Sequence, residues 1–85
     1  MSEIEKKHID RYHLLEVLHH RLEGSLHSHT DVLSIAYQMG LETEYAIDLI
    51  RYLKINGYIE TLGNTTIAML TDHGLRAAIR SELAA

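Results

Sequence analysis

The sequence predicts a mainly helical domain with a small β-hairpin, and two observations lead to this prediction. Apolar residues recur at helical spacing in four segments, whereas residues 58–62 and 65–70 resemble short strands around a Gly63-Asn64 turn. The chain has 85 residues, 46% apolar and 24% charged, which suffices for one domain with a modest core. We therefore expect the order helix, helix, helix, hairpin, helix in a single domain over residues 1–85.

Glycines and helix-capping residues divide the chain, which contains no proline. Thr30-Asp31 and Thr71-Asp72 are typical helix N-caps, and Gly40 and Asn56-Gly57 suit helix C-termini. Four segments result: an N-terminal helix over residues 1–23, a pair of helices over 30–57, a hairpin over 58–70 and a C-terminal helix over 71–85.

The predicted core follows from these periodicities. Its residues are Leu15, Leu18, Ala36, Met39, Ile50, Leu53, Ile59 and Leu70. In the hairpin, period-two alternation that turns Ile59, Ala68 and Leu70 inward turns Ile67 and Met69 outward. In the last helix, one face is expected to be formed by Leu75, Ala78, Ile79 and Leu83.

The charge balance argues against a dedicated nucleic-acid binder. The formal charge is −4, and protonation of all seven histidines would change it to +3. The chain has no cysteine, no signal-peptide pattern and no apolar run of the ~20 residues that a membrane span needs. These features predict a soluble, cytoplasmic protein that does not associate with membranes.

Three segments resemble winged helix-turn-helix transcription regulators. Residues 36–41, Ala-Tyr-Gln-Met-Gly-Leu, resemble the "Ala-x-x-Leu-Gly-Leu" turn of that family. Residues 56–59 resemble the "Gly-Leu-Ile" step into the wing, and residues 70–74 resemble the "Leu-Thr-x-x-Gly" that closes it. The resemblance covers about residues 30–83 and extends to short regulators of the PadR and ArsR type and related prokaryotic winged helix proteins.

The resemblance implies double-stranded DNA as a partner. The helix over residues 43–56 would be the recognition helix in the major groove, with DNA contacts from Thr43, Tyr45, Arg51 and Lys54. Acidic residues stand on the same helix or directly before it (Glu42, Glu44 and Asp48), and residues 60–66 of the wing contain no Lys or Arg. Because phosphate contacts dominate affinity, we expect weak DNA binding near neutral pH that strengthens as histidines become protonated.

A protein-binding module is the alternative prediction. Its binding face would consist of Tyr45, Ile47, Ile67 and Met69, which the periodicities turn outward. A second apolar patch, Ile9 and Val17, lies away from the main apolar face of the first helix. This patch predicts a homodimer built on the N-terminal helix.

Metal binding and catalysis find little support in the sequence. His27, His29 and Asp31 could offer three ligands, and His20 and His19 stand four residues from Glu16 and Glu23, but these spacings match no known ligand motif. The sequence has no phosphate-cradling glycine loop and no Ser-x-x-Lys or His-Glu-x-x-His arrangement. We predict no metal, no cofactor and no enzymatic activity.

Overall fold

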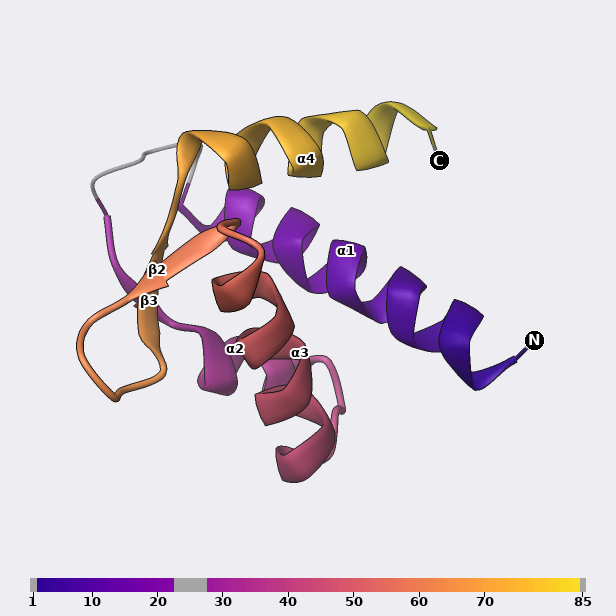
Figure 1. Cartoon of the computed structure of the whole chain (residues 1–85), viewed down its shortest axis with the longest axis horizontal. Coiled ribbons are helices and arrows are strands. Elements are labelled where there is room, and N and C mark those ends of the chain that lie inside the picture. The colour runs from indigo at the N-terminus through magenta and orange to yellow at the C-terminus, as the bar shows by residue number, and fades with distance from the viewer. Residues whose placement is uncertain (1, 23–27, 85) are drawn as a thin grey trace.

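The computed structural model describes residues 2–22 and 28–84. Over these residues the elements are α1 (Glu3–Arg21), β1 (Thr30–Asp31), α2 (Val32–Gln38), α3 (Thr43–Ile55), β2 (Ile59–Thr61), β3 (Ile67–Leu70) and α4 (Asp72–Ala84). The prediction of a mainly helical chain with a small hairpin is confirmed. Figure 1 shows α4 lying along α1, with α2, α3 and the strands on the other side of α1.

The small sheet has three strands, one more than the sequence predicted. Its order is β1-β3-β2, with both pairs antiparallel, so that the hairpin strand β3 lies in the middle. The sequence does not predict β1, because two residues are too few to show a periodicity. Asp31 is predicted only as a helix cap. Asp31 does cap α2, since its carboxylate accepts a hydrogen bond from the Leu33 N–H at 3.1 Å. The same oxygen also accepts a hydrogen bond from the Thr66 hydroxyl at 2.7 Å, which ties the cap to the hairpin.

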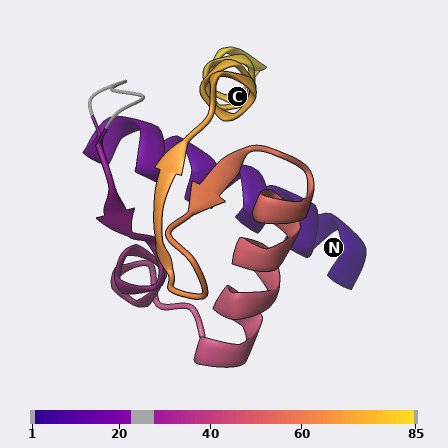
Figure 2. The ribbon, with the colours of Figure 1, turned by 60° about the vertical axis from the view of Figure 1, so that its left-hand side comes forward.

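The hydrophobic core lies between the helices and the inner face of the sheet. Seven of the eight predicted core residues are buried, and Met39 is partly buried and packs against them. The core also contains Leu14, Leu22, Val32, Ile35, Ala46, Leu49, Ala68, Ala77 and Ala78. Figure 2 shows how the elements surround it, with α1 crossing behind the strands and α4 seen almost end-on.

The packing face of α4 contains Ala78 as predicted but otherwise differs from the predicted one. The helix buries Gly74, Ala77 and Ala78, whereas Ile79 and Leu83 are 41% and 82% exposed. Small residues form the contact because α4 passes very close to the chain at Tyr58. A Cβ atom on Gly74 would lie 1.9 Å from the Tyr58 carbonyl oxygen. A prediction that favours large apolar side chains is therefore wrong for Ile79 and Leu83 of this helix.

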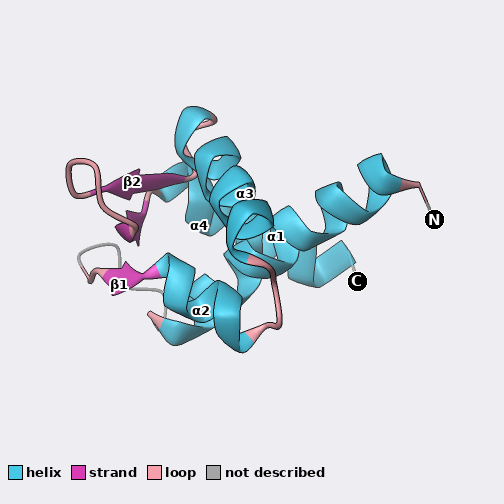
Figure 3. Cartoon of the chain, turned by 90° about the horizontal axis from the view of Figure 1, so that it is seen from below, coloured by secondary structure: helices cyan, strands magenta, loops and turns pink. Residues whose placement is uncertain are grey.

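The hairpin strands are shorter than predicted, because the residues next to Gly63-Asn64 belong to the connecting loop. The Thr65 hydroxyl donates a hydrogen bond to the Leu62 carbonyl at 2.6 Å, and Gly63 has a φ of 57°. Figure 3 shows the strands gathered at one side of the molecule, while the first turns of α1 extend away at the other. Ile4, in those first turns, is 81% exposed and lies outside the buried face of α1, which Leu14, Leu15 and Leu18 form.

Candidate nucleic-acid interface

The candidate interface is the outer surface of α3, which the turn after α2 sets in place. Gly40 makes this turn with a φ of 80°, and the Leu41 N–H donates to the Ala36 carbonyl at 3.0 Å. The hydroxyls of Tyr37 and Thr43 lie 2.9 Å apart and connect the two helices. On its inner side α3 buries Ala46, Leu49, Ile50 and Leu53. The opposite side of α3 is consequently held facing solvent.

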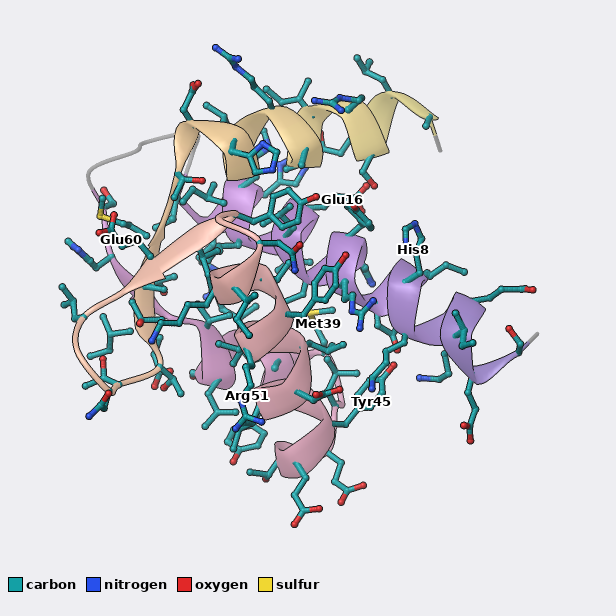
Figure 4. All side chains as sticks on the ribbon, viewed as in Figure 1. His8, Glu16, Met39, Tyr45, Arg51 and Glu60 are labelled. Carbon is teal, nitrogen blue, oxygen red and sulfur yellow. The ribbon has the colours of Figure 1, made fainter. Side chains whose placement is uncertain are left out.

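Two cations lie on the exposed side of α3. Arg51 and Lys54 are both exposed, and neither forms an ion pair with any residue in the described part of the chain. Figure 4 shows Arg51 and Tyr45 on opposite sides of α3, with Arg51 pointing away from α1. Of the four residues predicted to contact DNA, Thr43, Arg51 and Lys54 are exposed.

Tyr45 does not face outward as expected, because it lies between α3 and α1. Its hydroxyl donates a 2.5 Å hydrogen bond to Asp10, and the Lys6 ammonium lies 4.7 Å from its ring centroid. The Tyr45 ring is partly buried and packs against the core. Tyr45 belongs to both predicted faces, and in the structure its ring is partly covered and its hydroxyl is bonded to α1.

Asp10 is the acceptor at the centre of this α1–α3 contact. Partial burial disfavours its charged form, but hydrogen bonds from Lys6 and Tyr45 outweigh that effect and lower the pKa of its carboxyl group. The Lys6 ammonium lies 2.7 Å from the Asp10 carboxylate. This ionised, doubly hydrogen-bonded carboxylate therefore fixes the first half of α3 against α1.

A second ion pair changes the charge of the candidate interface. Asp48 of α3 lies 2.5 Å from the Lys7 ammonium of α1. The hydrogen bond from Lys7 lowers the pKa of the Asp48 carboxyl group and so keeps it ionised. One of the three acidic residues that the sequence placed near Arg51 is thus compensated by a cation, whereas Glu42 and Glu44 remain exposed.

The hairpin exposes apolar rather than basic side chains. Ile47 on α3 is 37% exposed and Ile67 on β3 is 39% exposed, as the periodicity predicted. Met69 is only partly exposed, opposite Glu60 in the β2–β3 register. Leu62, in the loop between the strands, is 48% exposed.

A groove of about 550 Å³, which no pattern in the sequence predicts, lies between α1 and α4. The Tyr58 and His73 rings stack with their centroids 4.5 Å apart, and the Tyr12 hydroxyl lies 3.3 Å from that of Tyr58. That shared hydrogen bond, together with partial burial, raises the pKa of Tyr12 to about 12. In Figure 4, the labelled His8 and Glu16 project from α1 toward the side where α4 lies. The groove offers aromatic faces and imidazoles.

The structure also brings together His19, His20 and Glu82, a group that the sequence did not suggest. The Glu82 carboxylate lies 2.8 Å from His20 Nε2 and 3.4 Å from His19 Nδ1. The glutamate is more than sixty residues from the histidines along the chain, so no local spacing could have revealed it. The predicted histidine cluster before α2 includes His27, and the predicted acidic partner of His19 is Glu23; both residues lie outside the described part of the chain. Asp31 of that cluster is engaged as the α2 cap.

Comparison with known proteins supplies no further assignment. No family model, no curated protein and no solved structure matches the chain. None of the helices within residues 2–22 and 28–84 has the length and apolar character to cross a membrane.

Proposed function

We propose that the chain is a winged helix domain of the transcription-regulator type that binds double-stranded DNA through the exposed side of α3. The observation that carries this proposal is the pair of cations on that side, Arg51 and Lys54, which have no ion-pair partner among the described residues. They lie three residues apart on α3 and are thus neighbours on its surface. In helix-turn-helix proteins the second helix of the motif enters the major groove, and α3 follows α2 through the tight turn at Gly40.

The helix and strand arrangement supports the same proposal. The three helices precede a hairpin and a closing helix, and β1 adds a third strand in the order β1-β3-β2. In a winged helix the hairpin is the wing, which lies beside the recognition helix and can reach the DNA backbone. Here the loop over residues 62–66 has no Lys or Arg, so its contacts to phosphate would come only from backbone N–H groups and hydroxyls.

The charges predict modest affinity. Asp48 is compensated by Lys7, but Glu42 and Glu44 face solvent near the start of α3 and repel phosphate. With only two phosphate contacts from basic side chains, log K should fall with log salt with a slope of about −2. Binding should strengthen between pH 7.5 and 5.5, because protonated histidines make the net charge positive.

The test is a titration of fluorescent duplex DNA at ~50 mM salt, a condition that favours electrostatic binding. Arg51→Ala and Lys54→Ala should each weaken binding by roughly 3- to 10-fold, or ~0.7–1.4 kcal/mol. Glu44→Gln should strengthen nonspecific binding by removing a repulsive charge. The matched control is Arg76→Ala, since Arg76 is exposed on α4 and already paired with Asp72 at 3.0 Å. An equal loss of DNA affinity in Arg76→Ala would show that binding does not depend on the exposed side of α3.

A protein-binding module is the second candidate, and a specific observation favours it. The side chains of Ile47, Leu62 and Ile67 are 37–48% exposed on α3 and the hairpin, where a DNA-binding surface normally carries cations. If no duplex binds at tens of micromolar protein at pH 7.5 or 5.5, this second function is favoured. Ile47→Ser and Ile67→Ser would then be the variants with which to map the partner.

We also propose a homodimer built on α1, with a narrower basis than the sequence indicated. Val17 is partly buried and packs against the core, so it is no longer part of an outer patch. Of the predicted patch only Ile9 stays exposed, at 50%, and Ile4, which was not part of that patch, is 81% exposed on the same helix. Sedimentation at micromolar concentration should show a dimer that Ile9→Glu dissociates, while Leu62→Glu in the hairpin loop leaves it intact. A wild-type monomer would contradict this proposal.

A further inference from the structure

Three potential metal ligands converge from α1 and α4. His19 and His20 lie in the last turn of α1, and Glu82 lies in the last turn of α4. Their nearest ligand atoms, one from each side chain, all lie within 4.8 Å of one another. The same carboxylate oxygen, Glu82 Oε1, is 2.8 Å from His20 Nε2 and 3.4 Å from His19 Nδ1.

These separations are close to what a zinc ion requires. Zinc binds imidazole nitrogen and carboxylate oxygen at ~2.0–2.2 Å in tetrahedral geometry, which places two ligand atoms about 3.3 Å apart. The two distances to Glu82 lie within about 0.6 Å of that value, whereas the ligand nitrogens of His19 and His20, within 4.8 Å of each other, would have to move closer by rotation of their side chains to complete the set. No thiolate is needed, because two imidazoles and one carboxylate are a combination that zinc accepts.

The surroundings of the three side chains leave room for a bound cation. The His19 side chain is 19% exposed and Glu82 is 31% exposed, whereas His20 is 71% exposed. One side of the cluster is thus shielded by protein and the other is open, which leaves a position for water as a fourth ligand. The C-terminal end of α1 also carries a partial negative charge that favours a cation beside it.

We propose that His19, His20 and Glu82 bind a Zn²⁺ ion that links α1 to α4. The link would act on a helix with little other anchorage near its end, since Ile79 and Leu83 are exposed and no residue of α4 after Ala78 is buried. Because a ligand that binds only the folded state stabilises it, zinc should raise the unfolding temperature. The site is independent of the α3 surface and of any DNA binding.

The experiment uses the full chain after treatment with a chelator and its removal. Zinc chloride is titrated by calorimetry, and unfolding is followed by circular dichroism with and without zinc. We expect one zinc per chain and a higher unfolding temperature in its presence. Glu82→Gln should weaken zinc binding by about tenfold or more, because its amide can still bond the imidazoles but is a much weaker ligand.

Two further variants make the result specific. His19→Gln should weaken zinc binding as Glu82→Gln does. His13→Gln, on the exposed side of α1 and two turns away, should bind zinc as the wild type does. The proposal is overturned if the wild type binds no zinc at ~100 μM, or if Glu82→Gln retains wild-type affinity, since other histidines would then hold the ion. The unfolding transition without zinc verifies that each variant is folded.

Discussion

Helices α3 and α4 are equally long, at 13 residues each, yet they are held in the molecule by different means. Helix α3 buries three large aliphatic side chains, Leu49, Ile50 and Leu53. Helix α4 buries only Gly74, Ala77 and Ala78 and leaves Ile79 and Leu83 exposed. Helix α3 is anchored by the volume of its side chains, and α4 by how closely its backbone approaches its neighbours. Shortening a buried side chain should therefore destabilise the protein most in α3, and enlarging one should destabilise it most in α4.

The largest effect is expected from shortening a large residue of α3. Leu53 has no exposed surface, so Leu53→Ala should reduce the free energy of unfolding by ~2–5 kcal/mol through lost burial and a residual cavity. Urea denaturation measures the change. Ile55→Ala, two residues on and 75% exposed, is the control and should change stability by less than ~0.5 kcal/mol. A loss below about 1 kcal/mol for Leu53→Ala would show that α3 is not anchored in this way.

In α4 the smallest enlargement should be harmful. Replacing a helical glycine with alanine ordinarily stabilises a protein by up to ~1 kcal/mol. At Gly74 the added Cβ would meet the Tyr58 carbonyl oxygen at 1.9 Å, and a backbone atom cannot move aside cheaply. Gly74→Ala should therefore cost ~1–3 kcal/mol, the range typical of overpacking. Thermal unfolding gives the sign, and a stabilised Gly74→Ala protein would refute the close approach.

The same contrast explains how far the sequence could predict this structure. In α3 the large aliphatic residues repeat at helical spacing, so Ile50 and Leu53 were placed in the core correctly. In α4 the contact is made by small residues, whose low hydrophobicity gives a weak pattern, and the predicted face was wrong for Ile79 and Leu83. Gly74 was visible in the sequence, but its role depends on Tyr58, which only the folded chain brings near.

The candidate sites show the same limit. Exposure of Ile67 followed from local periodicity, and that of Arg51 and Lys54 from the resemblance to winged helix regulators. The position of Tyr45 did not, because it depends on Lys6 and on Asp10, which is 35 residues earlier in the chain. The approach of Glu82 to His19 is also a tertiary contact that no spacing along the chain encodes.

The polar contact between α3 and α1 should contribute less than the core. Asp10→Asn removes a carboxylate that accepts hydrogen bonds from Lys6 and Tyr45, and should cost about 1 kcal/mol at pH 7. The pKa of Asp10 is lowered by folding, so this stabilisation is present above its ordinary value of 3.8 and is lost as the pH falls through the folded value. Urea denaturation at pH 7 and in steps below pH 4 should show the two proteins converging.

A double-mutant cycle with Tyr45→Phe separates this contact from general charge effects. Tyr45→Phe removes only the hydroxyl donor, so the cost of Asp10→Asn should be smaller in the Phe background. If the wild type and Asp10→Asn differ equally at every pH, Asp10 does not act through its charge.

The smallest effect is expected on the outer face of α4. Ile79→Ser removes a large apolar side chain that is 41% exposed, and in a monomer it should change the free energy of unfolding by about 0.5 kcal/mol or less. Measured at ~1 μM protein, a loss above 1 kcal/mol would mean that Ile79 is anchored like the large residues of α3. Repeating the measurement at ~100 μM sharpens the comparison, because oligomers gain stability with concentration. A loss of stability that appears only at the higher concentration would show that Ile79 makes contacts between chains. Within one chain, α4 is held by its small residues.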